Sequence, residues 1–187
     1  MINKPNNWES VQASGTSEKL PAGAYVVEIQ AAEVKTSQSG YEYLDMCIDV
    51  CEGEFTGFYR KDFDTQFEPR KWRGHYRQGT PRNDKAASFF KSMITAIEES
   101  NSGYQWNWDE RSLIGKKAGC LIRDEEWESE KGHGWSTAPF MLVSADKVRA
   151  GKYATPKPKP LPEKAAPALD MQMPAGFENI KDEDIPF

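Results

Sequence analysis

The sequence predicts a mainly β domain that is followed by a disordered C-terminal tail. Five segments have the β-rich or alternating composition of strands, and one segment between the third and the fourth has helical spacing. Beyond Lys152 the composition changes, with prolines at 156, 158, 160, 162, 167 and 174. The 187 residues therefore provide one domain of ordinary size and a tail.

The first two predicted strands form a hairpin. Residues 23–36 are rich in β-branched and apolar side chains, and residues 37–40, with the sequence SQSG, form a turn. Residues 41–53 alternate between two faces. The apolar face holds Leu44, Met46, Ile48 and Val50, and the opposite face holds Asp45, Cys47 and Asp49. This pattern predicts a half-buried antiparallel strand.

The remaining elements follow in order along the chain. A third strand is expected over 57–65, and a long loop over 68–82. Residues 83–103 predict a helix that Asn83 or Asp84 caps, because apolar residues recur at helical spacing. Two further strands are expected over 114–129 and 134–148.

The resulting order, β-β-β-α-β-β, is the connectivity of the OB-fold, a five-stranded and partly open barrel. Oligonucleotides bind that fold on strands two and three, beside the first and last hairpin loops, which here are residues 36–41 and 127–135. We therefore divide the chain into four parts. These are an N-terminal arm (1–20), an OB-fold domain (21–151), a Pro/Lys/Ala-rich disordered linker (152–177) and an acidic tip (178–187).

One segment of the domain is both basic and aromatic. The whole chain has a net charge of -5, yet residues 58–82 hold seven Lys/Arg and three Asp/Glu, a net charge of +4. Single-stranded DNA requires this mixture, because phosphates pair with cations and unpaired bases stack on aromatic rings. The candidate DNA contacts in this segment are Tyr59, Arg60, Lys61, Phe63, Arg70, Lys71, Trp72, Arg73, Tyr76 and Arg77.

Five further candidates lie outside that segment. They are Tyr43 in the second strand, Lys116 and Lys117 at the start of the fourth, and Trp127 and Trp135 beside the last hairpin loop. About half of the aromatic residues in the segment 58–82 are expected in the core, because a strand turns alternate side chains inward. For Trp72 and Tyr76 we favour contact with nucleic acid or with a neighbouring subunit.

Other chemistry is less well supported by the sequence. Cys47 and Cys51 lie ~13 Å apart on one extended strand, too far for a shared zinc ion. The odd count of three cysteines argues against a disulfide framework and favours a reducing cytosol. No metal or other cofactor is expected. Asp62 and Asp64 leave a Mg²⁺-dependent nuclease as the alternative in the enzyme class.

The chain ends in an acidic run followed by Ile-Pro-Phe. The residues are Asp182, Glu183, Asp184, Ile185, Pro186 and Phe187. A small β domain, a proline-rich linker and this tip resemble the single-stranded-DNA-binding proteins of bacteria and their phages, whose tip is an Asp-rich run closed by Ile-Pro-Phe or Leu-Pro-Phe. The resemblance covers the architecture and the last residues, and the insertion at 65–82 suggests a phage-encoded relative.

The resemblance implies a non-enzymatic protein of the bacterial cytoplasm. It would coat single-stranded DNA during phage replication, recombination or repair, and its tip would recruit host or phage enzymes. A partner pocket with a basic lip suits the side chain and the α-carboxylate of Phe187. A strand-annealing or recombination-mediator protein is the alternative among binding proteins, and assembly into a homo-oligomer stays open.

Overall fold

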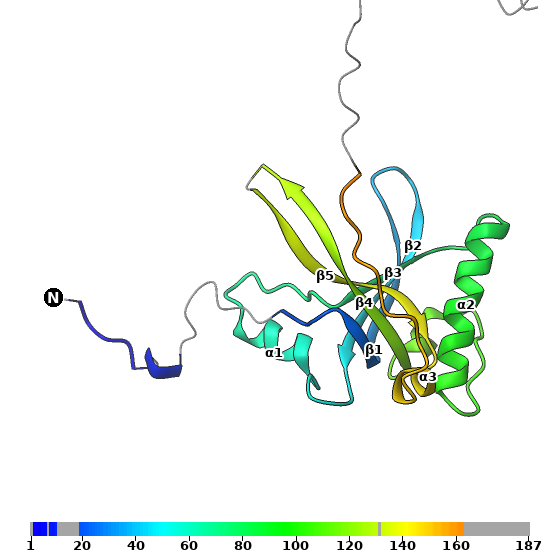
Figure 1. Cartoon of the computed structure of the whole chain (residues 1–187), viewed down its shortest axis with the longest axis horizontal. Helices are drawn as coiled ribbons and strands as arrows, with labels where there is room; N and C mark the ends of the chain where they lie inside the picture. The colour runs from blue at the N-terminus through cyan, green and yellow to red at the C-terminus, as the bar shows by residue number, and fades with distance from the viewer. Residues whose placement is uncertain (1, 7, 11–18, 131, 163–187) are drawn as a thin grey trace, which may run out of the picture.

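The computed structural model describes residues 2–6, 8–10, 19–130 and 132–162. Its centre is one antiparallel sheet in the order β3-β2-β1-β4-β5 (Figure 1). The strands are β1 (Gly23–Thr36), β2 (Glu42–Val50), β3 (His75–Gly79), β4 (Lys117–Ser129) and β5 (Gly132–Val143). The helices are α1 (Phe58–Thr65), α2 (Asp84–Ser100) and α3 (Ala145–Arg149), with short 3-10 turns η1 (Trp8–Ser10) and η2 (Glu110–Leu113). The prediction of a mainly β domain is confirmed.

Strand β1 organises the sheet because it pairs with two neighbours. Its first part, from Gly23 to Glu28, pairs with β4, and the part from Val27 to Thr36 pairs with β2. The register shifts between Ile29 and Ala31, an irregularity of the kind that bends a strand. Within the described residues β3 and β5 are edge strands that do not pair with each other, so the sheet is open.

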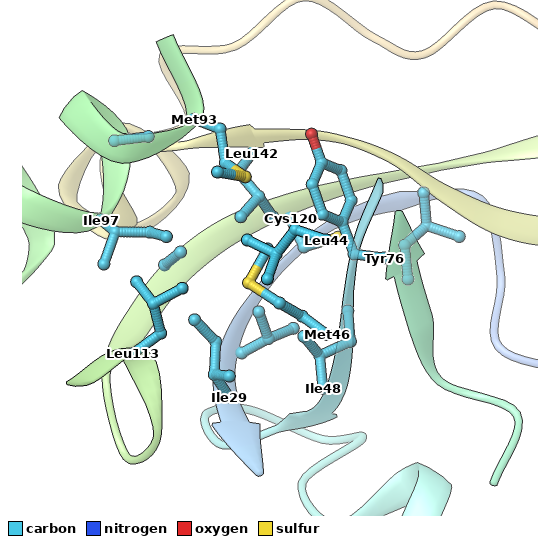
Figure 2. Packing of buried hydrophobic residues seen from close by; sticks show 14 of the residues in the cluster. Ile29, Leu44, Met46, Ile48, Tyr76, Met93, Ile97, Leu113, Cys120 and Leu142 are labelled. Atoms are coloured by element: carbon cyan, nitrogen blue, oxygen red, sulfur yellow. The ribbon is translucent and has the colours of Figure 1, made fainter. Parts of the chain in front are cut away.

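The core lies between the sheet and α2. Asn83 caps this helix, because its side chain accepts a hydrogen bond of 2.9 Å from the Ala86 N–H. Met93 and Ile97 of α2 point toward the buried side chains of the strands (Figure 2). The predicted apolar face of β2 is confirmed, but Asp45 and Asp49 on its other face are buried as well.

The region that precedes α2 differs from the prediction in two elements. Residues 57–65 form α1 where a strand was expected, and the expected loop 68–82 contains β3. The start of α1 is fixed by a residue distant in sequence: the buried Asp49 carboxylate accepts the N–H groups of Tyr59 and Arg60, at 2.9 and 3.2 Å. A carboxylate at this position satisfies amide groups that a helix start leaves without partners.

Two further differences concern the last strands. Strand β4 continues to Ser129 and β5 begins at Gly132, so most of the expected loop 127–135 belongs to the paired strands of a long hairpin. The expected strand 134–148 ends at Val143 and is followed by α3. No helix of the described part has the length and apolar composition needed to cross a bilayer.

The first part of the predicted linker is attached to the domain. Lys159 donates its N–H to the Asp124 carbonyl (2.8 Å) and accepts the Glu126 N–H (2.9 Å), while Leu161 donates its N–H to the Glu126 carboxylate (2.9 Å). Residues 152–162 thus leave α3 and reach the part of β4 that lies beyond its pairing with β1, where Lys159 pairs with Glu125 (Figure 1). The rest of the predicted linker and the tip 178–187 lie outside the described residues.

Candidate nucleic-acid interface

The predicted basic and aromatic residues gather on α1 and on the loop that follows it, residues 66–74. The Arg60 guanidinium lies over the Trp72 ring, 5.2 Å from its centroid, and that of Arg70 lies 5.9 Å from the Phe63 centroid. The Phe63 and Trp72 rings are 5.9 Å apart. A cation over the face of an aromatic ring is attracted to it, so these contacts stabilise the arrangement of α1 and the loop. Lys61 on α1 and Lys71 in the loop are exposed beside them.

The loop is held on α1 by side-chain hydrogen bonds. Gln66 donates to the Asp62 carboxylate (2.8 Å) and to the Lys71 carbonyl (3.0 Å), and its own carbonyl accepts the Lys71 N–H (2.9 Å). Arg73 forms an ion pair of 2.9 Å with Asp62. Trp72 donates its indole N–H to the carbonyls of Ile48 and Gly74. These bonds give the long loop a defined conformation.

Strand β3 continues this surface along the edge of the sheet. His75 and Arg77 share a face with Asp45 and Tyr43 of β2, because they pair across the strands with residues of that face. The His75 ring lies between the Asp45 carboxylate (3.0 Å) and the Trp72 carbonyl (2.9 Å), and so joins the loop to the sheet. The Arg77 guanidinium lies 6.0 Å from the Tyr43 centroid.

Asp45 is the buried anion beneath this surface. Lys35 (2.8 Å), His75 (3.0 Å) and Arg77 (3.4 Å) all contact its carboxylate. Burial alone raises the pKa of Asp45, but the hydrogen bonds from Lys35 and His75 outweigh it and hold that pKa below its ordinary value. The carboxylate therefore stays ionised and fixes cations at the sheet edge.

We name the connected surface the basic-aromatic strip. It consists of Arg60, Phe63, Arg70, Trp72, Arg73, His75, Arg77 and Tyr43. Arg82 extends it, because its guanidinium lies 4.1 Å from the centroid of the Tyr41 ring. Sequence reasoning missed Tyr41 and Lys35, because strand pairing brings them to the strip from other segments. It counted Arg82 in the basic segment 58–82 but did not name it as a DNA contact.

Two predicted contacts lie in the core. Tyr59 and Tyr76 are 6% and 4% exposed, so neither ring offers a face to a base. Tyr59 lies on the inward side of α1, edge-on to Phe58 at a centroid distance of 5.3 Å. Tyr76 alternates with His75 and Arg77 on β3 and therefore points inward. This finding corrects the expectation that both tyrosines contact DNA.

Lys116 and Lys117 belong to a separate cluster. The Lys116 ammonium lies 4.7 Å from the Tyr104 centroid, and that of Lys117 lies 3.3 Å from the Glu52 carboxylate. Arg149 of α3 pairs with the same carboxylate through two nitrogens, at 2.7 and 2.9 Å. The pKa of Glu52 is lowered to about 2, mainly by the hydrogen bonds from Arg149. These contacts give Lys117 a structural partner away from the strip.

The two hairpin tryptophans face opposite sides. Trp127 pairs across the hairpin with Gly134, and Trp135 with Glu126, so their side chains leave opposite faces. They are 42% and 46% exposed. Only Trp135 joins the region of the strip, because it lines a groove of about 240 Å³ shared with α1 and the loop. The lining residues are Lys19, Leu20, Phe58, Tyr59, Asp62, Arg73, Trp135, Ser136 and Thr137.

The acidic and thiol residues give no sign of metal chemistry in the described part of the chain. No group of three or more His, Cys, Asp or Glu lies in a position to hold a metal ion there. Asp62 is occupied by Arg73 and Gln66, and Asp64 is exposed. Cys47, Cys51 and Cys120 are free thiols, and burial raises the pKa of the Cys120 thiol.

The fold and this surface define a mainly β domain with an open sheet and a basic-aromatic strip at one edge. Comparison with known families matches residues 6–65 to a family described as "Protein of unknown function (DUF669)". The matched region includes β1, β2 and α1. No curated protein matches the chain.

Proposed function

We propose that the protein binds and coats single-stranded DNA along the basic-aromatic strip. The observation that carries the proposal is the connected series of cations and aromatic rings from Arg60 to Tyr43, on a loop fixed by hydrogen bonds. Phosphates pair with the guanidinium groups, while unpaired bases stack on exposed ring faces. Stacking asks for no particular base, so the binding tolerates any sequence.

The sheet topology supports an OB-type barrel that is open between β3 and β5. The central β1 lies between β2 and β4, and α2 follows β3, as in that fold. Oligonucleotides bind OB-folds across strands two and three, and here those strands carry Tyr43, His75 and Arg77. The location of the strip supports the proposal, because an OB-type barrel would bind an oligonucleotide there.

In this proposal the tip supplies the second activity. Asp182 to Phe187 recruit replication, recombination or repair enzymes of the phage or its bacterial host, through a hydrophobic pocket with a basic lip. The acidic residues steer the encounter with that lip. The resemblance of the tip to that of bacterial and phage single-stranded-DNA-binding proteins supports this part of the proposal.

Incubation of the full-length protein with labelled single-stranded DNA and Mg²⁺ tests the proposed class. We expect a stable complex that weakens as salt is added, with the DNA left intact. Shortened DNA would indicate a nuclease. Absence of any complex at low salt would overturn the proposal.

A further inference from the structure

We infer that the groove between the loop 66–74 and the β4–β5 hairpin receives one unpaired base of the bound strand. In this arrangement Trp135 is the stacking surface and Arg73 is the contact for a neighbouring phosphate. The inference rests on the proposed function and deepens it, because it assigns a subsite to a particular residue of the hairpin. We name this feature the Trp135 groove.

The walls of the Trp135 groove suit a flat and partly polar ligand. Trp135 stands on one side with nearly half of its surface exposed, and Phe58 of α1 lines the groove as well. The buried Tyr59 contributes to the lining but offers no face for stacking. Thr137 lies on the same face of β5 as Trp135 and adds a hydroxyl group. Thr137 is fixed by a 2.8 Å hydrogen bond to the Leu20 carbonyl, whereas Ser136 is exposed. Aromatic and hydroxyl groups together match the face and the edge of a nucleobase.

Arg73 is positioned before any ligand arrives. Its side chain is 57% exposed, but the Asp62 carboxylate that orients it is only 12% exposed. Asp62 is held in turn by Gln66 at 2.8 Å. A guanidinium has five N–H donors, so Asp62 can orient the group while its exposed side meets a phosphate. A cation held in this way loses less conformational freedom when it binds.

Trp127 provides a matched control within the same hairpin. It has nearly the same exposure as Trp135, yet it faces the other side of the hairpin, against Gly134, and does not line the groove. Replacement of Trp127 removes an exposed indole from β4, and replacement of Trp135 removes one from β5. Only the loss of Trp135 removes a wall of the groove.

Fluorescence anisotropy with a labelled oligothymidine and the full-length protein tests the assignment. We expect Trp135→Ala to weaken binding by roughly five- to a hundredfold, which is the loss of one stacked base. We expect Trp135→Phe to restore most of the affinity and Trp127→Ala to change it less than about twofold. Thermal melting by circular dichroism checks that each variant is folded.

A second probe separates stacking from backbone contact. An oligonucleotide of abasic sites keeps the phosphates and lacks the bases, so the parent and Trp135→Ala should bind it equally well. Equal losses on both probes, or equal effects of Trp135→Ala and Trp127→Ala, would overturn the groove assignment. If the parent binds oligothymidine and Trp135→Ala binds as tightly, the groove alone is refuted. If the parent does not bind, the proposed function is refuted with it.

Discussion

Arg73 and Arg77 are the residues on which the electrostatic part of the account depends. Each is exposed and is oriented by a carboxylate that is nearly or fully buried, Asp62 for Arg73 and Asp45 for Arg77. We expect the double change Arg73→Ala, Arg77→Ala to flatten the log-log salt dependence of DNA affinity by roughly one to two units, because two phosphate contacts are lost. Titration of affinity against salt measures this slope.

The exposed lysines of α2 give a control for that experiment. Lys85 and Lys91 are exposed on α2, and neither belongs to the residues that define the strip. Their double change to Ala removes the same charge and should leave the slope unaltered. Equal flattening by both pairs would mean that net charge, and not the strip, governs binding.

Trp72 is half-buried against the core, so its replacement should lower the stability of the fold. Its indole N–H donates to the Ile48 and Gly74 carbonyls, and its ring packs against the core cluster. We expect Trp72→Ala to lower the free energy of unfolding by about 2–3 kcal/mol, somewhat less than for a fully buried tryptophan. Urea unfolding followed by circular dichroism gives this value. Weaker DNA binding with unchanged stability would mean that Trp72 serves only as a stacking surface.

The lowered pKa of Asp45 implies that the folded chain loses stability as the pH falls. The pKa of Asp45 is lower in the folded chain than its ordinary value of 3.8. The stabilisation is therefore present above that value and is lost as pH falls through the folded pKa. We expect Asp45→Asn to be less stable than the parent at pH 7, and the difference to shrink as the pH falls below about 4. Urea unfolding over this range measures it, and a difference that stays constant with pH would contradict the assignment.

At the scale of elements, the sequence predicts those whose signals are local. The strands over 23–36 and 41–53 and the helix over 83–103 have apolar periodicity or a cap within their own residues. Helix α1 was not predicted because the residue that caps its first amides, Asp49, lies in β2 and not next to the helix in the sequence. Its aromatic and charged residues also fit a strand pattern.

The candidate site shows the same limit. The composition of residues 58–82 indicated where the basic and aromatic side chains are, but pairing decides which of them are exposed. Tyr76 belongs to the core because β3 is a strand, and β3 becomes evident only when it pairs with β2. The difference between Trp127 and Trp135 likewise depends on the register of the hairpin, which no local pattern specifies.

The segment 152–162 predicts a difference between two truncations. Two main-chain hydrogen bonds, and a third from the Leu161 N–H to the Glu126 carboxylate, join it to β4. A chain ending at Pro162 should unfold like the full-length protein, whereas a chain ending at Gly151 should lose about 1–3 kcal/mol of unfolding free energy. Denaturant titration of the two chains makes the comparison. Equal stabilities would show that the segment contributes nothing to the fold.

For the whole molecule, the tip is expected to compete with DNA for the basic-aromatic strip. The tip 182–187 lies outside the described residues, and its carboxylates are anions, as phosphates are. The sequence predicts a flexible linker before it, and such a linker would give the tip an effective concentration of about millimolar at the strip. We expect deletion of 182–187 to leave folding unchanged and to preserve or tighten DNA binding, most clearly at low salt. Anisotropy titrations of both chains at two salt concentrations measure the effect.

Removal of Phe187 alone distinguishes recruitment of a partner from competition with DNA. Its removal alone leaves the acidic residues in place, so DNA affinity should hardly change while a partner enzyme is lost in a pull-down from host extract. Loss of DNA binding after deletion of 182–187 would instead place the tip in the DNA site and contradict the recruitment role.

The charge distribution of the whole chain leads to the decisive measurement. The protein is acidic overall, at -5, and its +4 segment spans α1, the loop and β3. Such a molecule should hold DNA through one limited surface, and stacking requires unpaired bases.

Equilibrium binding to single-stranded DNA, duplex DNA and RNA over a range of salt concentrations tests the central claim most directly. The account predicts tight binding to single-stranded DNA, with a log-log slope of about -0.7 for each contacted phosphate, and weaker binding to duplex DNA. Preference for duplex DNA, or no affinity for single strands at low salt, would contradict it.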